Sequence, residues 1–229
     1  MGNLFSVKNA CEQVGMEAGI TSNAREIRQA GAVILHGVGA FGEAMKTLRR
    51  LGLVDLLQEV AASGKGKPFI GICLGMQLLM TESFEFGRHP GLGLIKGQVV
   101  RFEPPPKREA LKPSLKVPQI GWNQIHPVSP RGWGDSPETS PLAGLSPGEY
   151  MYFVHSFHAL VRLTGEDSFS ILSATQYGPV SFCSSFRRGN IVAFQFHPER
   201  SGPIGLQIYK NLAQWIIQSN QWRSEWLNR

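Results

Sequence analysis

The chain has 229 residues, of which 42% are hydrophobic and 17% charged, as in a soluble globular protein that can bury a sizeable core. Its three cysteines form no Cys-x-x-Cys pair, which argues against a disulfide framework and a structural zinc site. No apolar run approaches the roughly 20 residues that span a bilayer, and the first residues do not form a signal peptide. We therefore expect a cytoplasmic protein with no membrane contact, no metal and no cofactor.

The net charge is +6, but the basic residues are scattered and form no long run or stripe interleaved with aromatic residues. This distribution favours a solvated basic surface over nucleic-acid binding. A docking face for an acidic partner or a phosphorylated metabolite stays open.

The predicted elements of the first half alternate between helix and strand. Helices are expected at residues 8–14, 23–29 (with Asn23 as N-cap), 41–51, 54–63 and 74–82, and strands at 17–21, 32–35 and 69–73. This alternation predicts an α/β fold with an open, mostly parallel sheet flanked by helices.

The second half is rich in predicted strands, which would make antiparallel additions to the sheet. They lie at residues 94–102, 150–155, 160–162, 169–175, 180–187 and 191–196, before a helix at 204–219. Residues 104–118 and 129–147 are rich in proline or glycine and predict surface loops. No linker divides the chain, so we expect a single domain over residues 1–229.

Cys73 is the candidate nucleophile. Gly71-Ile72-Cys73-Leu74-Gly75 lies at a predicted strand-to-helix junction, the pattern of a nucleophile elbow. The amino end of the following helix would favour the thiolate, and the backbone N–H of Leu74 would stabilise an oxyanion. Alone, the pattern favours catalysis only modestly over a buried structural cysteine. Cys11 and Cys183 lack the flanking glycines and are better explained as structural.

His197 is the candidate base, because it follows an apolar predicted strand and sites of open sheets assemble at strand ends. Pro198 gives the chain an extended exit, and Glu199 can curl back to orient the imidazole. The other five histidines are better explained as surface or core residues. His36, His89 and His126 fall in predicted loops, and His155 and His158 have no carboxylate close by in the sequence.

Two motifs, Gly71-Ile72-Cys73-Leu74-Gly75-Met76-Gln77 and Phe196-His197-Pro198-Glu199, resemble those of class I glutamine amidotransferases. Further segments are similar to the glutaminase subunits of imidazole glycerol phosphate synthases, and the likeness runs from Gly2 to about Trp215. These segments are Gly37-Val38-Gly39-Ala40-Phe41, Pro118-Gln119-Ile120-Gly121-Trp122-Asn123, Tyr152-Phe153-Val154-His155-Ser156 and His197-Pro198-Glu199-Arg200-Ser201-Gly202. The resemblance implies a flavodoxin-like fold.

The resemblance also implies the chemistry. Cys73 would attack the side-chain amide of glutamine, His197 would protonate the departing ammonia, and water would hydrolyse a glutamyl thioester. Val38 and Gly39 would join Leu74 in the oxyanion hole. The residues expected to bind glutamine are Gln77, Glu85, Ser156 and Phe157. Without the resemblance, Gln77 and Glu85 would be explained as solvated surface residues.

The same resemblance implies a heterodimer with a (β/α)8-barrel cyclase, which would take up the ammonia and make imidazole glycerol phosphate in histidine biosynthesis. Asn3, Trp122 and Asn123 match segments at the docking face. An exposed tryptophan is a plausible interface anchor, although Trp122 could equally be a core aromatic residue.

The chain departs from this family at its start, where an internal apolar strand normally precedes Gly2-Asn3. We expect an upstream extension of the reading frame to supply a Val/Ile-rich strand, while a truncated sequence and an inactive remnant stay open. Smaller departures are His36 for a usual proline, Gln119 for a histidine and Phe157 for a tyrosine.

Three other functions compete with this interpretation. The same glutaminase could serve another synthase, which genomic neighbours would reveal. A catalytically dead binding subunit would fit the missing strand, but Cys73, His197 and Glu199 argue against it. A general cysteine hydrolase is the third, and Gln77 and Glu85 favour glutamine over other acyl substrates.

Overall fold

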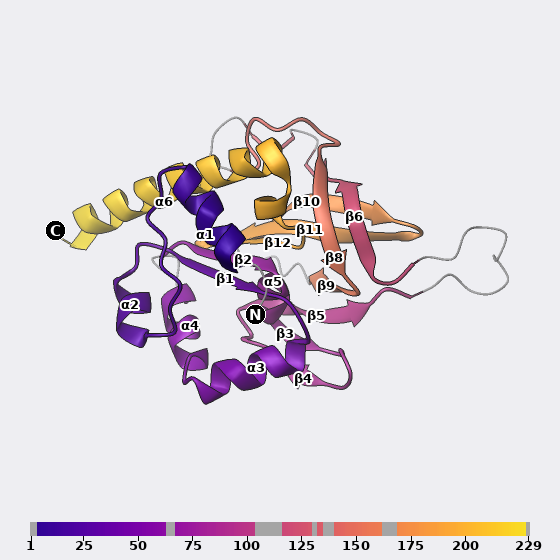
Figure 1. Ribbon diagram of the computed structural model, residues 1–229, viewed down its shortest axis with the longest axis horizontal. Coiled ribbons are helices and arrows are strands. Elements are labelled where there is room, and N and C mark those ends of the chain that lie inside the picture. The colour runs from indigo at the N-terminus through magenta and orange to yellow at the C-terminus, as the bar shows by residue number, and fades with distance from the viewer. Residues whose placement is uncertain are drawn as a thin grey trace, which may run out of the picture.

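A central sheet with helices on both faces forms the body of the protein (Figure 1). This computed structural model describes residues 4–62, 67–103, 116–129, 132–134, 140–161 and 169–227. Within these ranges no helix combines the length and apolarity needed to cross a bilayer.

The central sheet has the order β1-β2-β12-β11-β10-β7. Its strands are β1 (Val33–Gly37), β2 (Phe69–Cys73), β12 (Ile191–Phe194), β11 (Val180–Arg188), β10 (Phe169–Tyr177) and β7 (His126–Pro127). The first three run parallel, and the last three add antiparallel. The predicted α/β fold with antiparallel additions is therefore confirmed.

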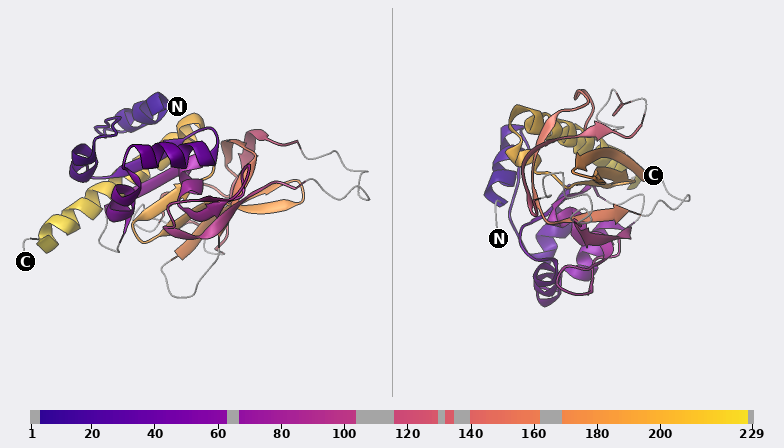
Figure 2. Two further views of the ribbon diagram at one scale, coloured as in Figure 1. Left: turned by 90° about the horizontal axis from the view of Figure 1, so that it is seen from below. Right: turned by 90° about the vertical axis from the view of Figure 1, so that its right-hand side faces the viewer.

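The helices divide between the two faces of this sheet, and each face has its own core. One core joins α2 (Ala24–Gln29), α3 (Phe41–Arg50) and α4 (Val54–Ala61) to the sheet. The other core joins α1 (Leu4–Gln13) and the long α6 (Gly202–Leu227) to the opposite face of the sheet. The two further views in Figure 2 show α1 lying beside α6.

Strand β2 is buried along its whole length because both faces are covered. Phe69 points into the core with α2 to α4, whereas Ile70 and Ile72 point into the core with α1 and α6. Burying one such side chain stabilises the fold by roughly 1.5–3 kcal/mol. The strand that carries Cys73 is thus held firmly in the sheet.

Two smaller sheets complete the second half. One has the order β4-β3-β5-β9, formed by β4 (His89–Pro90), β3 (Met80–Ser83), β5 (Ile95–Arg101) and β9 (Phe157–Val161). The other pairs β6 (Gln119–Gln124) with β8 (Tyr150–His155) in antiparallel register. Strand β6 is absent from the sequence-based predictions.

The predicted helix at residues 74–82 is too long. Helix α5 (Leu74–Leu78) makes one turn, and β3 begins at Met80. The carbonyls of Leu78 and Leu79, which would extend the helix, instead accept hydrogen bonds from Leu92 and Ile95 at 2.8 and 2.9 Å. Tertiary pairing overrides the local helical preference here.

The predicted strand at residues 17–21 is wrong, because this segment is irregular. No described residue offers it a ladder partner, and an isolated strand is not stable in water. The neighbouring β1 is the edge of the central sheet and pairs with β2 alone among the described residues. The first described element is α1, and no strand precedes it in this part of the chain.

The predicted surface loop at residues 129–147 is only partly a surface loop. Trp133, Leu142 and Ala143 are buried, and the Trp133 ring N–H donates to the carbonyl of Leu172 at 2.8 Å. The Asn211 side chain donates to the carbonyl of Ala143 at 2.9 Å. Most of the other predicted loop, residues 104–115, lies outside the described residues. The remaining predicted elements are present, the strands at residues 69–73 and 150–155 with the predicted ends and most of the others with shifted ends.

Candidate active site

Cys73 occupies a strained turn between β2 and α5, with a φ of 53°. Such a conformation costs a non-glycine residue roughly 1–3 kcal/mol. The turn is also tight, because a Cβ at Gly75 would lie 1.8 Å from the carbonyl oxygen of Leu35. A Cβ at Gly71 would lie 3.0 Å from the backbone nitrogen of Met76. The structure therefore has the elbow geometry that the glycine spacing predicts.

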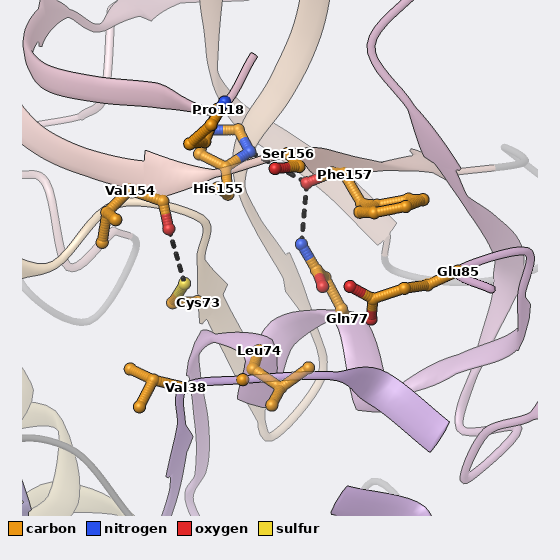
Figure 3. A pocket seen from close by; sticks show the side chains of 11 residues that line it. Val38, Cys73, Leu74, Gln77, Glu85, Pro118, Val154, His155, Ser156 and Phe157 are labelled. Atoms are coloured by element: carbon orange, nitrogen blue, oxygen red, sulfur yellow. Dashed lines mark hydrogen bonds between the residues drawn. The ribbon is translucent and has the colours of Figure 1, made fainter. Parts of the chain in front are cut away.

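The Cys73 thiol is buried but only weakly held. Its Sγ lies 3.9 Å from the carbonyl oxygen of Val154, and the Nε2 of Gln195 donates to it at 3.8 Å. Figure 3 shows the first of these contacts. Thiols make weak hydrogen bonds, so neither contact locks the sulfur. Gln195 is a site residue that the sequence analysis does not single out.

His197 and Glu199 are held together directly after β12. The Nδ1 of His197 and the Oε1 of Glu199 are 2.7 Å apart. The short helix η2 (Pro198–Arg200) brings the carboxylate back toward the ring. The His197 backbone N–H donates to Tyr152 at 2.9 Å, and its carbonyl accepts from the Ser201 hydroxyl at 2.7 Å. Both ends of the histidine backbone are thus fixed.

The pKa values of the buried His197 and Glu199 are shifted in opposite directions. Burial lowers the pKa of His197, but contact with the Cys73 thiol and the Glu199 carboxylate outweighs this and raises it to about 10. Burial raises the pKa of Glu199, but its contacts with His197 and His36 lower it to about 2. At neutral pH the imidazolium and the carboxylate are therefore both charged. Among the residues that the structure describes, the Nε2 of His197 has no aligned hydrogen-bond partner, so it stays available for a reacting group.

His36 is the second unexpected residue of the site. It lies in β1 and not in the predicted loop, and its side chain is fully buried. Its Nε2 lies 3.3 Å from the Oε1 of Glu199, and its ring lies edge-on to that of His197 with centroids 5.6 Å apart. Parallel pairing of β1 with β2 brings this side chain to the triad, a long-range contact that no local pattern could reveal.

A pocket of about 250 Å³ opens beside Cys73. The residues that line it are Val38, Gly39, Cys73, Leu74, Gln77, Glu85, Pro118, Val154, His155, Ser156 and Phe157. Figure 3 shows their side chains converging on the space above the elbow. The candidate oxyanion residues and the candidate glutamine-binding residues therefore meet in one cavity.

Gln77 and Glu85 lie on one side of this pocket (Figure 3). The Nε2 of Gln77 donates to the carbonyl of Phe157 at 2.8 Å and to the Oε1 of Gln195 at 3.1 Å. The carboxylate of Glu85 accepts from the backbone N–H of Phe41 at 2.6 Å. Both side chains are held by internal contacts, contrary to their explanation as solvated surface residues.

The residues where β8 passes into β9 also line the pocket, next to Gln77. The carbonyl of Phe157 accepts from Gln77 and also from the Nδ1 of His155 at 2.8 Å, so His155 carries its proton there. Burial lowers the pKa of His155 to about 3 despite this bond. A neutral, buried His155 agrees with its prediction as a core residue.

The remaining cysteines and histidines also match their predicted structural roles. Burial raises the pKa of Cys11 to about 11 and that of Cys183 to about 12. His158 is buried against the ring of Phe102, with a centroid distance of 4.7 Å. His89 and His126 lie in the short strands β4 and β7 and not in the predicted loops, and His126 is on the surface. None of these groups reaches the pocket.

The residues expected at a docking face have different environments. Trp122 is 56% exposed and packs edge-on against Tyr152, so it is not a core aromatic residue. Asn123 is engaged within the chain, because its side chain donates to the carbonyl of Gln176 at 3.0 Å. Asn3 lies outside the described residues.

The sequence model of the family Glutamine amidotransferase class-I matches residues 3–214. A solved structure of a glutamine amidotransferase has the same fold, with a TM-score of 0.63 and 19% identity. That match covers 95% of this chain and 94% of the other. The chain is therefore a class I glutamine amidotransferase.

Curated relatives narrow the family. The imidazole glycerol phosphate synthase subunit HisH of Carboxydothermus hydrogenoformans is 43% identical, over 94% of this chain and 96% of that protein. The subunit HisH of Aquifex aeolicus is 44% identical, over 92% of this chain and 91% of that protein. The chain belongs to the HisH family of imidazole glycerol phosphate synthase subunits.

Proposed function

We propose that this chain hydrolyses glutamine to glutamate and ammonia, with Cys73 as nucleophile, His197 as acid and base, and Glu199 orienting the imidazole. The observation that carries the proposal is the strained Cys73 elbow at the floor of a pocket, beside the buried His197–Glu199 pair. A cysteine paired with an imidazolium is activated as thiolate at neutral pH.

The thiolate attacks the side-chain carbonyl carbon of glutamine, and the C–N bond breaks as His197 gives its proton to the departing nitrogen. A glutamyl thioester and ammonia result. The neutral His197 then takes a proton from water, which attacks the thioester carbonyl and releases glutamate and the thiolate. Leu74, at the amino end of α5, supplies one oxyanion donor, and the segment Val38-Gly39 supplies the second.

Four pocket residues bind the rest of the glutamine molecule. The carboxylate of Glu85 attracts the α-ammonium group, and Gln77, Ser156 and Phe157 contact the remaining polar groups. Gln77 is well suited to this role, because its amide nitrogen is bonded within the protein and its oxygen stays available.

A partner enzyme uses the ammonia that this chain produces. By analogy with its HisH relatives, the chain acts in a heterodimer with a (β/α)8-barrel cyclase that makes imidazole glycerol phosphate for histidine biosynthesis. An exposed apolar surface on the β6–β8 sheet supports docking there: Ile120, Trp122 and Tyr150 are 63%, 56% and 54% exposed. The neighbouring Val154 touches the Cys73 thiol, so this surface adjoins the pocket.

The test is glutamate release from glutamine, measured for the chain alone, with a cyclase subunit, and with the cyclase and its nucleotide ligand. We expect weak turnover alone and strong turnover with both. Cys73→Ala should abolish turnover, whereas Cys11→Ala, which removes a buried thiol of α1, should retain it. Substantial turnover in Cys73→Ala would reject the mechanism, and a cyclase that neither binds nor activates the chain would reject the pathway.

A further inference from the structure

The carboxylate of Glu199 has two imidazole neighbours and not one. Its Oε1 lies 2.7 Å from the Nδ1 of His197 and 3.3 Å from the Nε2 of His36. The His36 contact is within hydrogen-bond distance but is not aligned as a hydrogen bond in this structure. His36 lies in β1 and His197 in the segment between β12 and η2, so the carboxylate links β1 to this segment.

Burial makes the second contact significant. The side chains of His36 and Glu199 are both fully shielded from solvent, so water neither screens their interaction nor substitutes for it. Among the described residues, the Oε2 of Glu199 has no hydrogen-bond partner. The contacts of the carboxylate with both imidazoles are made by its Oε1, which the two rings share.

We propose that His36 is a positioning residue of the triad, whose Nε2–H donates to Glu199 and limits how firmly that carboxylate holds the proton of His197. This inference rests on the proposed function of the triad. A small rotation of the His36 ring aligns the donor, and the N–H dipole then offsets part of the negative charge that faces His197. His36 thereby makes the imidazolium a better acid toward the departing ammonia.

Other titratable side chains also interact with His197 and Glu199. Cys73 interacts directly with His197, whereas the buried His155 is neutral, and the positive charge of His197 adds to the lowering of its pKa. Burial raises the pKa of the Tyr209 hydroxyl, and the charge of Glu199 raises it further. His36, His197 and Glu199 are also the one group of three metal-ligand-type side chains found within 4.8 Å among the described residues. Measurements should therefore include a chelator.

The direction of the effect follows from electrostatics. Removing the His36 donor leaves the full charge of Glu199 facing His197, which stabilises the imidazolium and raises the pKa of that ring. One neutral hydrogen bond in a buried site corresponds to a shift of roughly half to one pH unit. A purely structural role for His36 would change stability and rate but would not move this pKa upward.

The experiment measures the rate of Cys73 alkylation by iodoacetamide against pH, with EDTA present and the modified peptide identified by mass. It needs neither glutamine nor a partner, so its failure is distinguishable from failure of the proposed function. In a thiolate–imidazolium pair, the upper step of this profile reports loss of the imidazolium proton. We expect His36→Leu to move that step up by about 0.5–1 pH unit.

His36→Gln is the conservative variant, because its side-chain amide places an N–H donor near the position of Nε2. Its upper step should stay close to that of the unmodified chain. In a Glu199→Gln background, His36→Leu should produce no shift, because the charge on which it acts is gone. His126→Gln, at an exposed histidine, is the control and should also produce no shift.

An unchanged or lowered upper step in His36→Leu would overturn the proposal. So would a His36→Gln profile shifted as far as that of His36→Leu. Should His36→Leu fail to fold, His36→Ala removes the same donor without adding bulk, and the same outcomes apply to it.

Discussion

The carboxylate of Glu85 and the backbone N–H of Phe41 are joined by a hydrogen bond of 2.6 Å. Phe41 is the first residue of α3, and Ala40 at the cap position has no side chain that could bond to the helix. Glu85 therefore caps α3 from a distant part of the chain while it lines the pocket. One side chain supports both the helix after the Val38-Gly39 segment and the proposed glutamine site.

Substitutions at Glu85 should separate these two roles. Glu85→Ala removes both the cap and the charge, and should lower the free energy of unfolding by about 1 kcal/mol and raise KM for glutamine by at least ~10-fold. Glu85→Gln keeps an oxygen that can accept from Phe41, so it should raise KM with little loss of stability. Urea unfolding and glutaminase kinetics measure the two effects. Equal destabilisation by both variants would contradict the capping role.

Gly75 should tolerate no side chain. A Cβ there would lie 1.8 Å from the carbonyl oxygen of Leu35, which belongs to β1 and cannot move freely. We expect Gly75→Ala to lower the free energy of unfolding by more than about 3 kcal/mol or to prevent folding. Gly19→Ala, where a Cβ meets nothing within 4 Å, is the control and should be neutral. A stable Gly75→Ala protein would show that the elbow relaxes easily.

The His197–Glu199 pair should give stability a distinct pH dependence. The pKa of Glu199 is lowered to about 2, so its contribution is present above pH 4.5 and is lost as pH falls toward 2. The pKa of His197 is raised to about 10, so its contribution is present below pH 6.5 and is lost as pH rises toward 10. Both contributions to the free energy of unfolding are therefore fully present only between about pH 4.5 and 6.5.

The measurement is the difference in free energy of unfolding between the unmodified chain and Glu199→Gln, followed by urea unfolding across pH. This difference should be largest between about pH 4.5 and 6.5 and should shrink on either side. A difference that stays constant from pH 6.5 into alkaline pH would mean that His197 is neutral in the folded protein.

Trp122 should contribute to partner binding and not to folding. Its side chain is 56% exposed, so Trp122→Ala should change the free energy of unfolding by less than about 0.5 kcal/mol. As a buried anchor in a complex it should weaken cyclase binding by ~30-fold or more. Ile217→Ala, at an equally exposed residue of α6, is the matched control. Calorimetric titration that finds the two variants equal would remove the β6–β8 sheet as the docking face.

Local chemistry and spacing predicted the centre of the site. The glycines around Cys73 indicate a strained elbow, and the short step from His197 to Glu199 indicates an imidazole–carboxylate pair, because both patterns act within a few residues. Asn23 caps α2 as predicted for the same reason, accepting from the Arg25 N–H at 2.8 Å.

Contacts between distant segments could not be predicted in this way. His36 reaches Glu199 only because β1 pairs with β2, and Gln195 reaches Cys73 only because β12 pairs with β2 on its other side. The length of α5 is set by backbone pairing with residues more than ten positions further along. Glu17 begins a segment with a strand-like pattern that lacks a partner, so alternation alone did not make it a strand.

Strand β1 contacts the candidate active site twice, through the Leu35 carbonyl next to Gly75 of the elbow and through His36 next to Glu199 of the triad. Among the described residues it is also the edge strand of the central sheet, and edge elements open locally at a lower free energy than the centre of a sheet. Local opening of these few residues would free both the Cys73 turn and the Glu199 side chain, while both hydrophobic cores stay folded. We therefore expect glutaminase activity to disappear at a urea concentration below the global unfolding midpoint, with hydrogen exchange in β1 faster than in β2.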